Sequence, residues 1–161
     1  QLDTDFFDDK ATYLEEFPRV VYTGMIDQFF DYKFGELEYR SLRFESEVLP
    51  TDNAQGNAVI NYTDAETPYT RVMEWRHFDQ KGDDNVSILT REYPQVWDRS
   101  KEAYYPVNDE KNSTLFKQYR SEAKQLDKVI MGGRLGNYQY YDMDQVFNAA
   151  LGAVEKEFQQ D

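Results

Sequence analysis

Two glycines near the C-terminus are followed by side chains that suit an anion. The stretch from Gly132 to Met143 reads GGRLGNYQYYDM, and it carries Arg134 and three tyrosines, Tyr138, Tyr140 and Tyr141. Glycines let the backbone approach a ligand closely, and guanidinium and phenol groups donate hydrogen bonds to phosphate oxygens. The stretch therefore indicates an anion site. A glycine-rich connection whose tyrosines fill a core would explain the same residues.

A helix is expected directly after this stretch. Apolar residues recur there at helical spacing, namely Met143, Val146, Phe147, Ala150, Leu151 and Val154. The start of a helix offers unpaired N–H groups and a positive dipole end to an anion. Asp142 is expected to cap this helix, and we expect no capping box because Asp144 and Gln145 follow it closely.

A second cation, Arg71, lies in an apolar segment that alternates like a strand from Tyr69 to Phe78. An arginine there must be paired or must face a cleft, because leaving an ion unpaired in the interior costs on the order of several kcal/mol. Two interpretations stay open at this point. Arg71 either forms a structural ion pair with one of the many acidic side chains or binds an anion.

The charge and composition exclude several classes of function. The formal charge of -13, from 31 acidic and 18 basic residues, repels nucleic acids and anionic membranes, but a few focused arginines can still hold one diphosphate. No apolar run is long enough to span a membrane, and no leader opens the chain, so a cytoplasmic location is expected. The absence of cysteine excludes disulfides and thiolate sites, and no spacing of acidic residues with the single histidine suggests a metal site.

Four blocks in the same order resemble the UDP-galactopyranose mutases, flavoenzymes that interconvert the six- and five-membered ring forms of UDP-galactose. The blocks are RVVYTGMIDQFFDYKFGELEYRSLRFE at 19–45, GNAVINYTDAETPYTR at 56–71, EAYYPVND at 102–109 and GGRLGNYQYYDMD at 132–144. Four ordered blocks are far more specific than any one short motif. No G-x-G-x-x-G fingerprint is present, so the resemblance implies the C-terminal portion of such an enzyme.

The resemblance assigns ligand contacts to residues in each block and no certain catalytic residue. The matching substrate-binding positions are Asn61, Arg71, Tyr105, Tyr140 and Asp142. The matching cofactor-binding positions are Gly24, Gly133, Arg134, Asp142 and Met143. Glu92 matches an acid near the active site, with a surface glutamate as the alternative. Tyr104 and Tyr141 would be packing neighbours, although the sequence alone does not decide which tyrosine of each pair faces the ligand.

The resemblance also implies a mechanism and partners. In the family, N5 of reduced FAD attacks the anomeric carbon of the sugar, UDP leaves, and the ring opens and recloses in the other size. The product, UDP-galactofuranose, serves cell-surface polysaccharide synthesis, and the full-length enzyme can form a homodimer. Most of the FAD site would lie outside this chain, so we expect the isolated chain to be inactive.

The predicted fold class is α+β, with a twisted antiparallel sheet of about four to six strands, a C-terminal helix and one further long helix. Strands are expected at 19–24, 37–49, 58–62, 69–78, 86–93 and 129–131, helices at 10–17, 25–32, 109–126 and 142–158, and a hairpin turn at 81–85. The helix at 109–126 is expected to be capped by Asp109 or Asn112, and His77 to lie on a strand in a structural role. Residues 1–161 would form one C-terminal fragment. In it, 19–32 and 128–158 would join the FAD-binding domain, and 37–107 would form the substrate-binding sheet.

Two other classes of function remain as alternatives. Another FAD-dependent oxidoreductase would share the Gly-Gly-Arg turn, but it would have no reason to share the blocks at 56–71 and 102–109. A non-enzymatic module that binds carbohydrate or a protein partner would explain the tyrosines and the acidity. It gives no reason for a Gly-Gly-Arg turn ahead of a helix.

Overall fold

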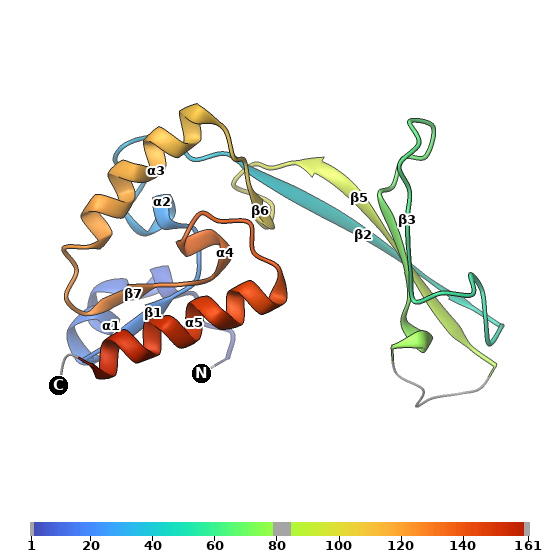
Figure 1. Ribbon diagram of the computed structural model, residues 1–161, viewed down its shortest axis with the longest axis horizontal. Coiled ribbons are helices and arrows are strands. Elements are labelled where there is room, and N and C mark those ends of the chain that lie inside the picture. Colours follow the sequence, from blue (N-terminus) through green and yellow to red (C-terminus); the bar gives the residue numbers. More distant parts are fainter. Residues whose placement is uncertain (1, 79–84, 160–161) are drawn as a thin grey trace. The chain divides into compact units, whose positions relative to one another are not determined.

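The computed structural model describes residues 2–78 and 85–159, which form two compact units (Figure 1). Residues 2–39 and 103–159 make up the first unit, and the described part of 40–102 makes up the second. The fold is α+β, with an antiparallel sheet, a long C-terminal helix and one further long helix, which confirms the predicted class. The turn expected at 81–85 lies outside the described residues except for Asn85.

The first unit is built around two short parallel strands. Its elements are η1 (Phe6–Asp8), α1 (Lys10–Glu16), β1 (Val20–Tyr22), α2 (Ile26–Phe29), β6 (Tyr105–Pro106), α3 (Glu110–Ala123), β7 (Val129–Met131), α4 (Gly133–Gly136) and α5 (Met143–Phe158). β1 pairs with β7 in parallel, with Val20 opposite Val129 and Tyr22 opposite Met131. This pairing joins two segments that are far apart in the sequence and places the carboxyl ends of both strands at one edge.

Tyrosines form much of the core of the first unit, and their hydroxyl groups have partners. Tyr22 packs on Phe29 with ring centroids 5.0 Å apart. The Tyr39 hydroxyl donates to Asp27 Oδ1 at 2.7 Å, and the Leu37 N–H donates to Asp27 Oδ2 at 2.9 Å. Burial raises the pKa of Asp27, and these hydrogen bonds offset part of that effect. The Asp27 carboxylate is therefore hydrogen-bonded inside an aromatic core.

Both long helices begin at caps that the sequence identifies. Asp109 caps α3, and its Oδ1 accepts a hydrogen bond from the Asn112 N–H at 2.7 Å. Of the two cap residues that the sequence offered, Asp109 is therefore the N-cap. Asp142 caps α5 as predicted. The exclusion of a capping box was wrong, because Gln145 occupies the third helical position and its Oε1 accepts from the Asp142 N–H at 2.9 Å.

The apolar stripe of α5 is exposed. Its members are spaced three or four residues apart, and they are Met143, Phe147, Leu151, Val154 and Phe158. The small residues Ala149, Gly152 and Ala153 of α5 line a hollow that the residues of β7 also line. The helical period was therefore predicted correctly, but the large apolar side chains do not pack into this unit.

The second unit is an antiparallel sheet. Its strands are β2 (Tyr39–Leu49), β3 (Val59–Asn61), β4 (Arg71–Glu74) and β5 (Ser87–Val96), and they lie in the order β3-β4-β5-β2. All four expected strands are present. The strand expected to reach Phe78 ends at Glu74, however, and a short helix, η2 (Trp75–His77), follows it. The placement of His77 on a strand was therefore wrong.

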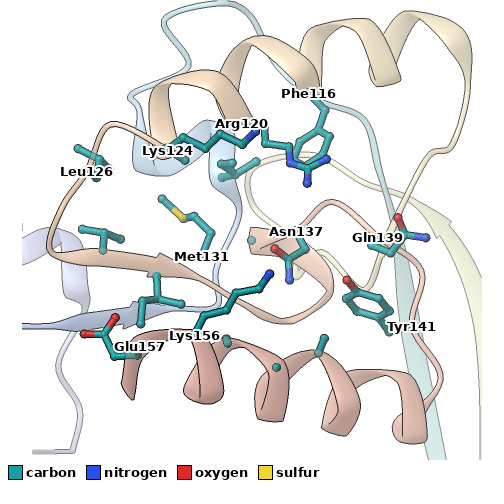
Figure 2. Close-up of a pocket in the computed structure, with 18 residues that line it drawn as sticks. Phe116, Arg120, Lys124, Leu126, Met131, Asn137, Gln139, Tyr141, Lys156 and Glu157 are labelled. Carbon is teal, nitrogen blue, oxygen red and sulfur yellow. The ribbon is translucent and has the colours of Figure 1, made fainter. Parts of the chain in front are cut away.

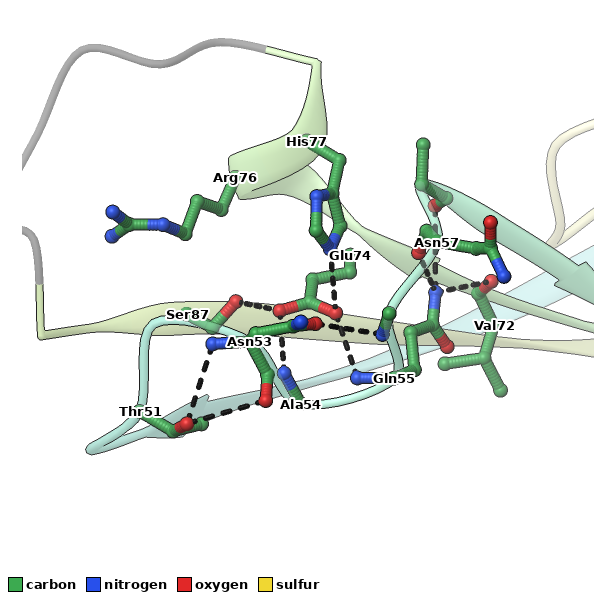
Figure 3. Close-up of polar contacts among 12 residues, drawn as sticks. Thr51, Asn53, Ala54, Gln55, Asn57, Val72, Glu74, Arg76, His77 and Ser87 are labelled. Atoms are coloured by element: carbon green, nitrogen blue, oxygen red, sulfur yellow. Dashed lines mark hydrogen bonds and ion pairs between the residues drawn. The ribbon is translucent and has the colours of Figure 1, made fainter.

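A buried carboxylate lies at the end of β4 (Figure 3). Glu74 is fully buried and accepts hydrogen bonds from the Ala54 N–H at 2.8 Å, the Gln55 N–H at 2.9 Å and the Ser87 hydroxyl, while His77 Nε2 lies 3.1 Å from its Oε2. Burial by itself would raise the pKa of Glu74, but the hydrogen bonds outweigh it and lower the pKa to about 2. This network holds the loop before β3 against the sheet.

Candidate functional site

Three predicted ligand residues lie in one row across the sheet of the second unit. Asn61 on β3 is directly opposite Arg71 on β4, and Arg71 is directly opposite Glu92 on β5. Directly opposite residues in antiparallel strands share a face of the sheet. Asn61, Arg71 and Glu92 therefore form a continuous polar row, which neither spacing nor composition could predict.

The contacts within this row fix the guanidinium of Arg71. Its Nε donates to Asn61 Oδ1 at 3.0 Å, and its Nη1 lies 3.7 Å from Glu92 Oε2. Glu92 is almost buried and also accepts from the Thr70 hydroxyl at 3.1 Å, whereas 41% of the Arg71 side chain is exposed. Arg71 thus forms an ion pair and keeps a surface open to an anion, so the two sequence-based interpretations are compatible.

A second group of predicted residues meets in the first unit. The rings of Tyr105 and Tyr140 lie with centroids 5.3 Å apart, and Cζ of Arg134 is 5.0 Å from the first ring and 5.1 Å from the second. Arg134 Nε donates to the carbonyl of Tyr141 at 2.7 Å, which ties the arginine to the residue beside Tyr140. The arginine expected at the cofactor therefore contacts two tyrosines expected at the substrate.

The third tyrosine of the glycine-rich stretch belongs to the core. Tyr138 is buried, and its hydroxyl donates to the Glu38 carbonyl at 2.6 Å and lies 3.1 Å from that of Val107. Burial raises the pKa of Tyr138 well above its usual value. The core-filling explanation thus holds for Tyr138 and not for Tyr140, of which 48% is exposed.

The glycine turns lie at the carboxyl ends of β1 and β7. The Gly132 N–H donates to the Tyr22 carbonyl at 2.9 Å, and Gly133, with a φ of +70°, lies against Thr23. A Cβ on Gly24 would lie 2.5 Å from Tyr22 Oη, so this glycine is also required for packing. In sheets with parallel strands, ligands bind outside the carboxyl ends of the strands.

The connection between these glycines and α5 differs from the expected simple turn. The four-residue helix α4 starts at Gly133 and was not predicted, and α5 then begins at Met143. Met143 is largely exposed, and Asp142 is engaged through its backbone in the capping box. Both residues remain accessible at the start of α5.

The two groups of residues belong to different units. Asn61, Arg71 and Glu92 lie in the second unit, and all other predicted site residues lie in the first.

The first unit also contains a hollow of about 770 Å³ between α3, β7 and α5 (Figure 2). Figure 2 shows Arg120 on α3 and Lys156 on α5 pointing into it. Among the predicted residues only Tyr141, expected as a packing neighbour, lines this hollow. The hollow is therefore separate from the residues that the sequence assigns to ligands.

Comparison with known proteins identifies the family. The family model described as UDP-galactopyranose mutase matches residues 1–140. The chain belongs to this family. The resemblance found in the four sequence blocks is thereby confirmed for the mutases as a group.

Individual mutases show the extent of the similarity. The chain is 36% identical over 141 residues to dTDP-fucopyranose mutase of Escherichia coli, covering 88% of this chain and 37% of that protein. It is 38% identical over 142 residues to UDP-galactopyranose mutase of Mycoplasma pneumoniae, with 85% and 35% covered, and 37% identical over 142 residues to that of Mycoplasma genitalium, with 85% and 34% covered. The chain thus spans little more than a third of the length of these mutases.

Two other kinds of feature are absent from the described residues. No helix within 2–78 or 85–159 is both long enough and apolar enough to cross a membrane. Within the same residues, no three acidic or histidine side chains are grouped so that they could hold a metal ion.

Proposed function

We propose that this chain is the substrate- and flavin-contacting C-terminal part of a UDP-galactopyranose mutase, which interconverts UDP-galactopyranose and UDP-galactofuranose. The observation that carries the proposal is the row of Asn61, Arg71 and Glu92, because it presents a fixed, accessible guanidinium on an otherwise acidic chain. A guanidinium binds diphosphate oxygens through two parallel hydrogen bonds. In this proposal, residues 37–107 form the substrate-binding sheet.

We propose the same kind of ligand for the tyrosines of the first unit. The hydroxyl groups of Tyr105 and Tyr140 donate to phosphate oxygens, while Arg134 holds the two rings together. Phenol donors add hydrogen bonds without adding charge, so the site needs no basic surface. The chain then contributes by orienting the nucleotide sugar and holding its leaving diphosphate.

The residues at the carboxyl ends of β1 and β7 fit FAD. Two glycine turns meet at this edge, Gly136 approaches the Tyr22 carbonyl so closely that a Cβ would lie 3.0 Å from it, and Arg134 provides a cation beside the turn. Gly24, Gly133, Arg134, Asp142 and Met143 would hold the cofactor, with 19–32 and 128–158 as parts of its domain. Bound in its reduced form, FAD supplies the nucleophile for the rearrangement at the anomeric carbon.

A second substrate is supported by one of the comparisons. The Escherichia coli relative is named dTDP-fucopyranose mutase, and a dTDP-sugar carries the same diphosphate as a UDP-sugar. Arg71, Tyr105 and Tyr140 would serve both substrates alike. Parallel titrations with UDP-galactose and dTDP-fucose distinguish the two, because only the preferred nucleotide sugar should bind more tightly than its nucleoside diphosphate.

We also propose that the isolated chain neither retains FAD nor turns over, because it matches only 37% and 35% of the length of two of its mutase relatives. A cytoplasmic location and a homodimeric full-length enzyme are parts of the same proposal. Stoichiometric flavin absorbance or mutase activity in the purified chain would refute the first part.

Replacing Arg71 tests the proposed diphosphate contact. We expect Arg71→Ala to weaken the binding of UDP-galactose and of UDP by roughly 10- to 100-fold in calorimetric titrations, since hydrogen bonds to charged groups are lost. Arg91→Ala is the matched control. It removes the same charge from the opposite face of the sheet, where Arg91 pairs with Glu47 at 3.0 Å. Equal losses in both variants would contradict a local contact and indicate a general field effect.

A further inference from the structure

One aromatic side chain extends the polar row of the second unit. Phe44 on β2 is directly opposite Glu92 on β5, so the row runs Asn61, Arg71, Glu92, Phe44 across four strands. Phe44 is 42% exposed on the face that carries Arg71. The resemblance assigns no role to Phe44.

The order of chemical groups along this row matches the order of groups in a nucleotide sugar. Adjacent strands are about 4.8 Å apart, so the backbones of Arg71 and Phe44 are separated by roughly 10 Å. That span accommodates one phosphate and one hexose ring. The guanidinium suits the phosphate, the carboxylate of Glu92 can accept from sugar hydroxyls, and an aromatic ring suits the apolar C–H face of the hexose.

We propose that Phe44 contacts the hexose ring of the substrate and that the sugar lies across β5, over Glu92 and towards β2. This inference rests on the proposed function, and it adds a residue that recognises the sugar and not the nucleotide. Glu92 keeps acceptor capacity for the sugar, because Thr70 and Arg71 occupy only part of its four lone-pair positions.

Titration of the 161-residue chain with UDP-galactose and with UDP tests this assignment. We expect Phe44→Ala to weaken UDP-galactose binding about three- to tenfold and to leave UDP binding unchanged. Val48→Ala is the matched control, because Val48 is 66% exposed on the same strand and the same face but lies beyond the row, opposite Ile88. It should change neither affinity.

The outcomes separate this inference from the proposed function. If Phe44→Ala weakens both ligands equally, or weakens neither, while Arg71→Ala weakens both, the assignment of Phe44 is overturned and the diphosphate site stands. If the unaltered chain binds neither ligand, both proposals are overturned. Should tryptophan fluorescence show that Phe44→Ala is unfolded, Phe44→Leu keeps the apolar volume and must show the same selective loss for UDP-galactose.

Discussion

Replacing Glu74 by glutamine should destabilise the second unit in a pH-dependent way. The pKa of Glu74 is about 2 in the folded chain against an ordinary value of 4.5, and this difference corresponds to about 3 kcal/mol of folding free energy at neutral pH. Because the folded pKa is the lower one, this stabilisation is present above pH 4.5. It is lost as the pH falls from 4.5 towards 2.

The two tryptophans make this change measurable in the second unit alone. Trp75 and Trp97 both lie within 40–102, so their fluorescence reports the urea unfolding of this unit. The free energy of unfolding of the wild type should exceed that of Glu74→Gln by about 3 kcal/mol at pH 7, and this difference should fall by about 2 kcal/mol at pH 3. A difference that does not change with pH would refute the assignment of the low pKa to the buried hydrogen bonds.

A matched variant separates this effect from the general loss of a negative charge. Glu47 is a partly exposed acid on β2 that pairs with Arg91 at 3.0 Å, and Glu47→Gln should cost less than about 1 kcal/mol. The Glu74 network also holds the loop that leads into β3, the strand that carries Asn61. Glu74→Gln should therefore weaken UDP binding as well, whereas Glu47→Gln should not.

Two further predictions concern the first unit. Tyr138→Phe removes the hydroxyl that donates to the Glu38 carbonyl, so it should lower the free energy of unfolding by about 1–3 kcal/mol. Chemical denaturation followed by circular dichroism measures this change, and an unchanged midpoint would argue against the hydrogen bond. Gly133→Ala should lower the free energy of unfolding by about 1–2 kcal/mol, because φ is +70° at this position. In α5, a Cβ added to Gly152 would have no atom within 4 Å, so Gly152→Ala should raise the free energy of unfolding by about 0.5–1 kcal/mol. Thermal midpoints that move in the same direction for the two glycine variants would contradict this argument.

Local signals in the sequence were sufficient for most elements. β-branched runs placed β1 and β7, alternation placed β2, and an acidic cap followed by helical spacing placed α3. The end of β4 could not be predicted in this way. The strand ends at Glu74, whose buried carboxylate accepts hydrogen bonds from Ala54, Gln55 and Ser87, and these donors come from distant segments.

The glycine-rich stretch shows the same division between local and distant information. Its arginine and tyrosines indicated an anion site, but Tyr138 and Tyr140 are of the same residue type and two positions apart. Only packing distinguishes them, since Tyr138 reaches the carbonyl of Glu38 whereas Tyr140 lies beside Tyr105. The sequence alone could not show which residues these two side chains contact in the fold.

The sequence by itself determined the family, the fold class and the residue types suited to a diphosphate, because these depend on ordered motifs and local periodicity. Only the tertiary structure decided that Asn61, Arg71, Glu92 and Phe44 stand in one row, and that Arg134 lies against Tyr105 and Tyr140. For the row, the physical reason is strand register. A shift of one residue would move each side chain to the other face, and the register depends on contacts between segments that no local pattern records.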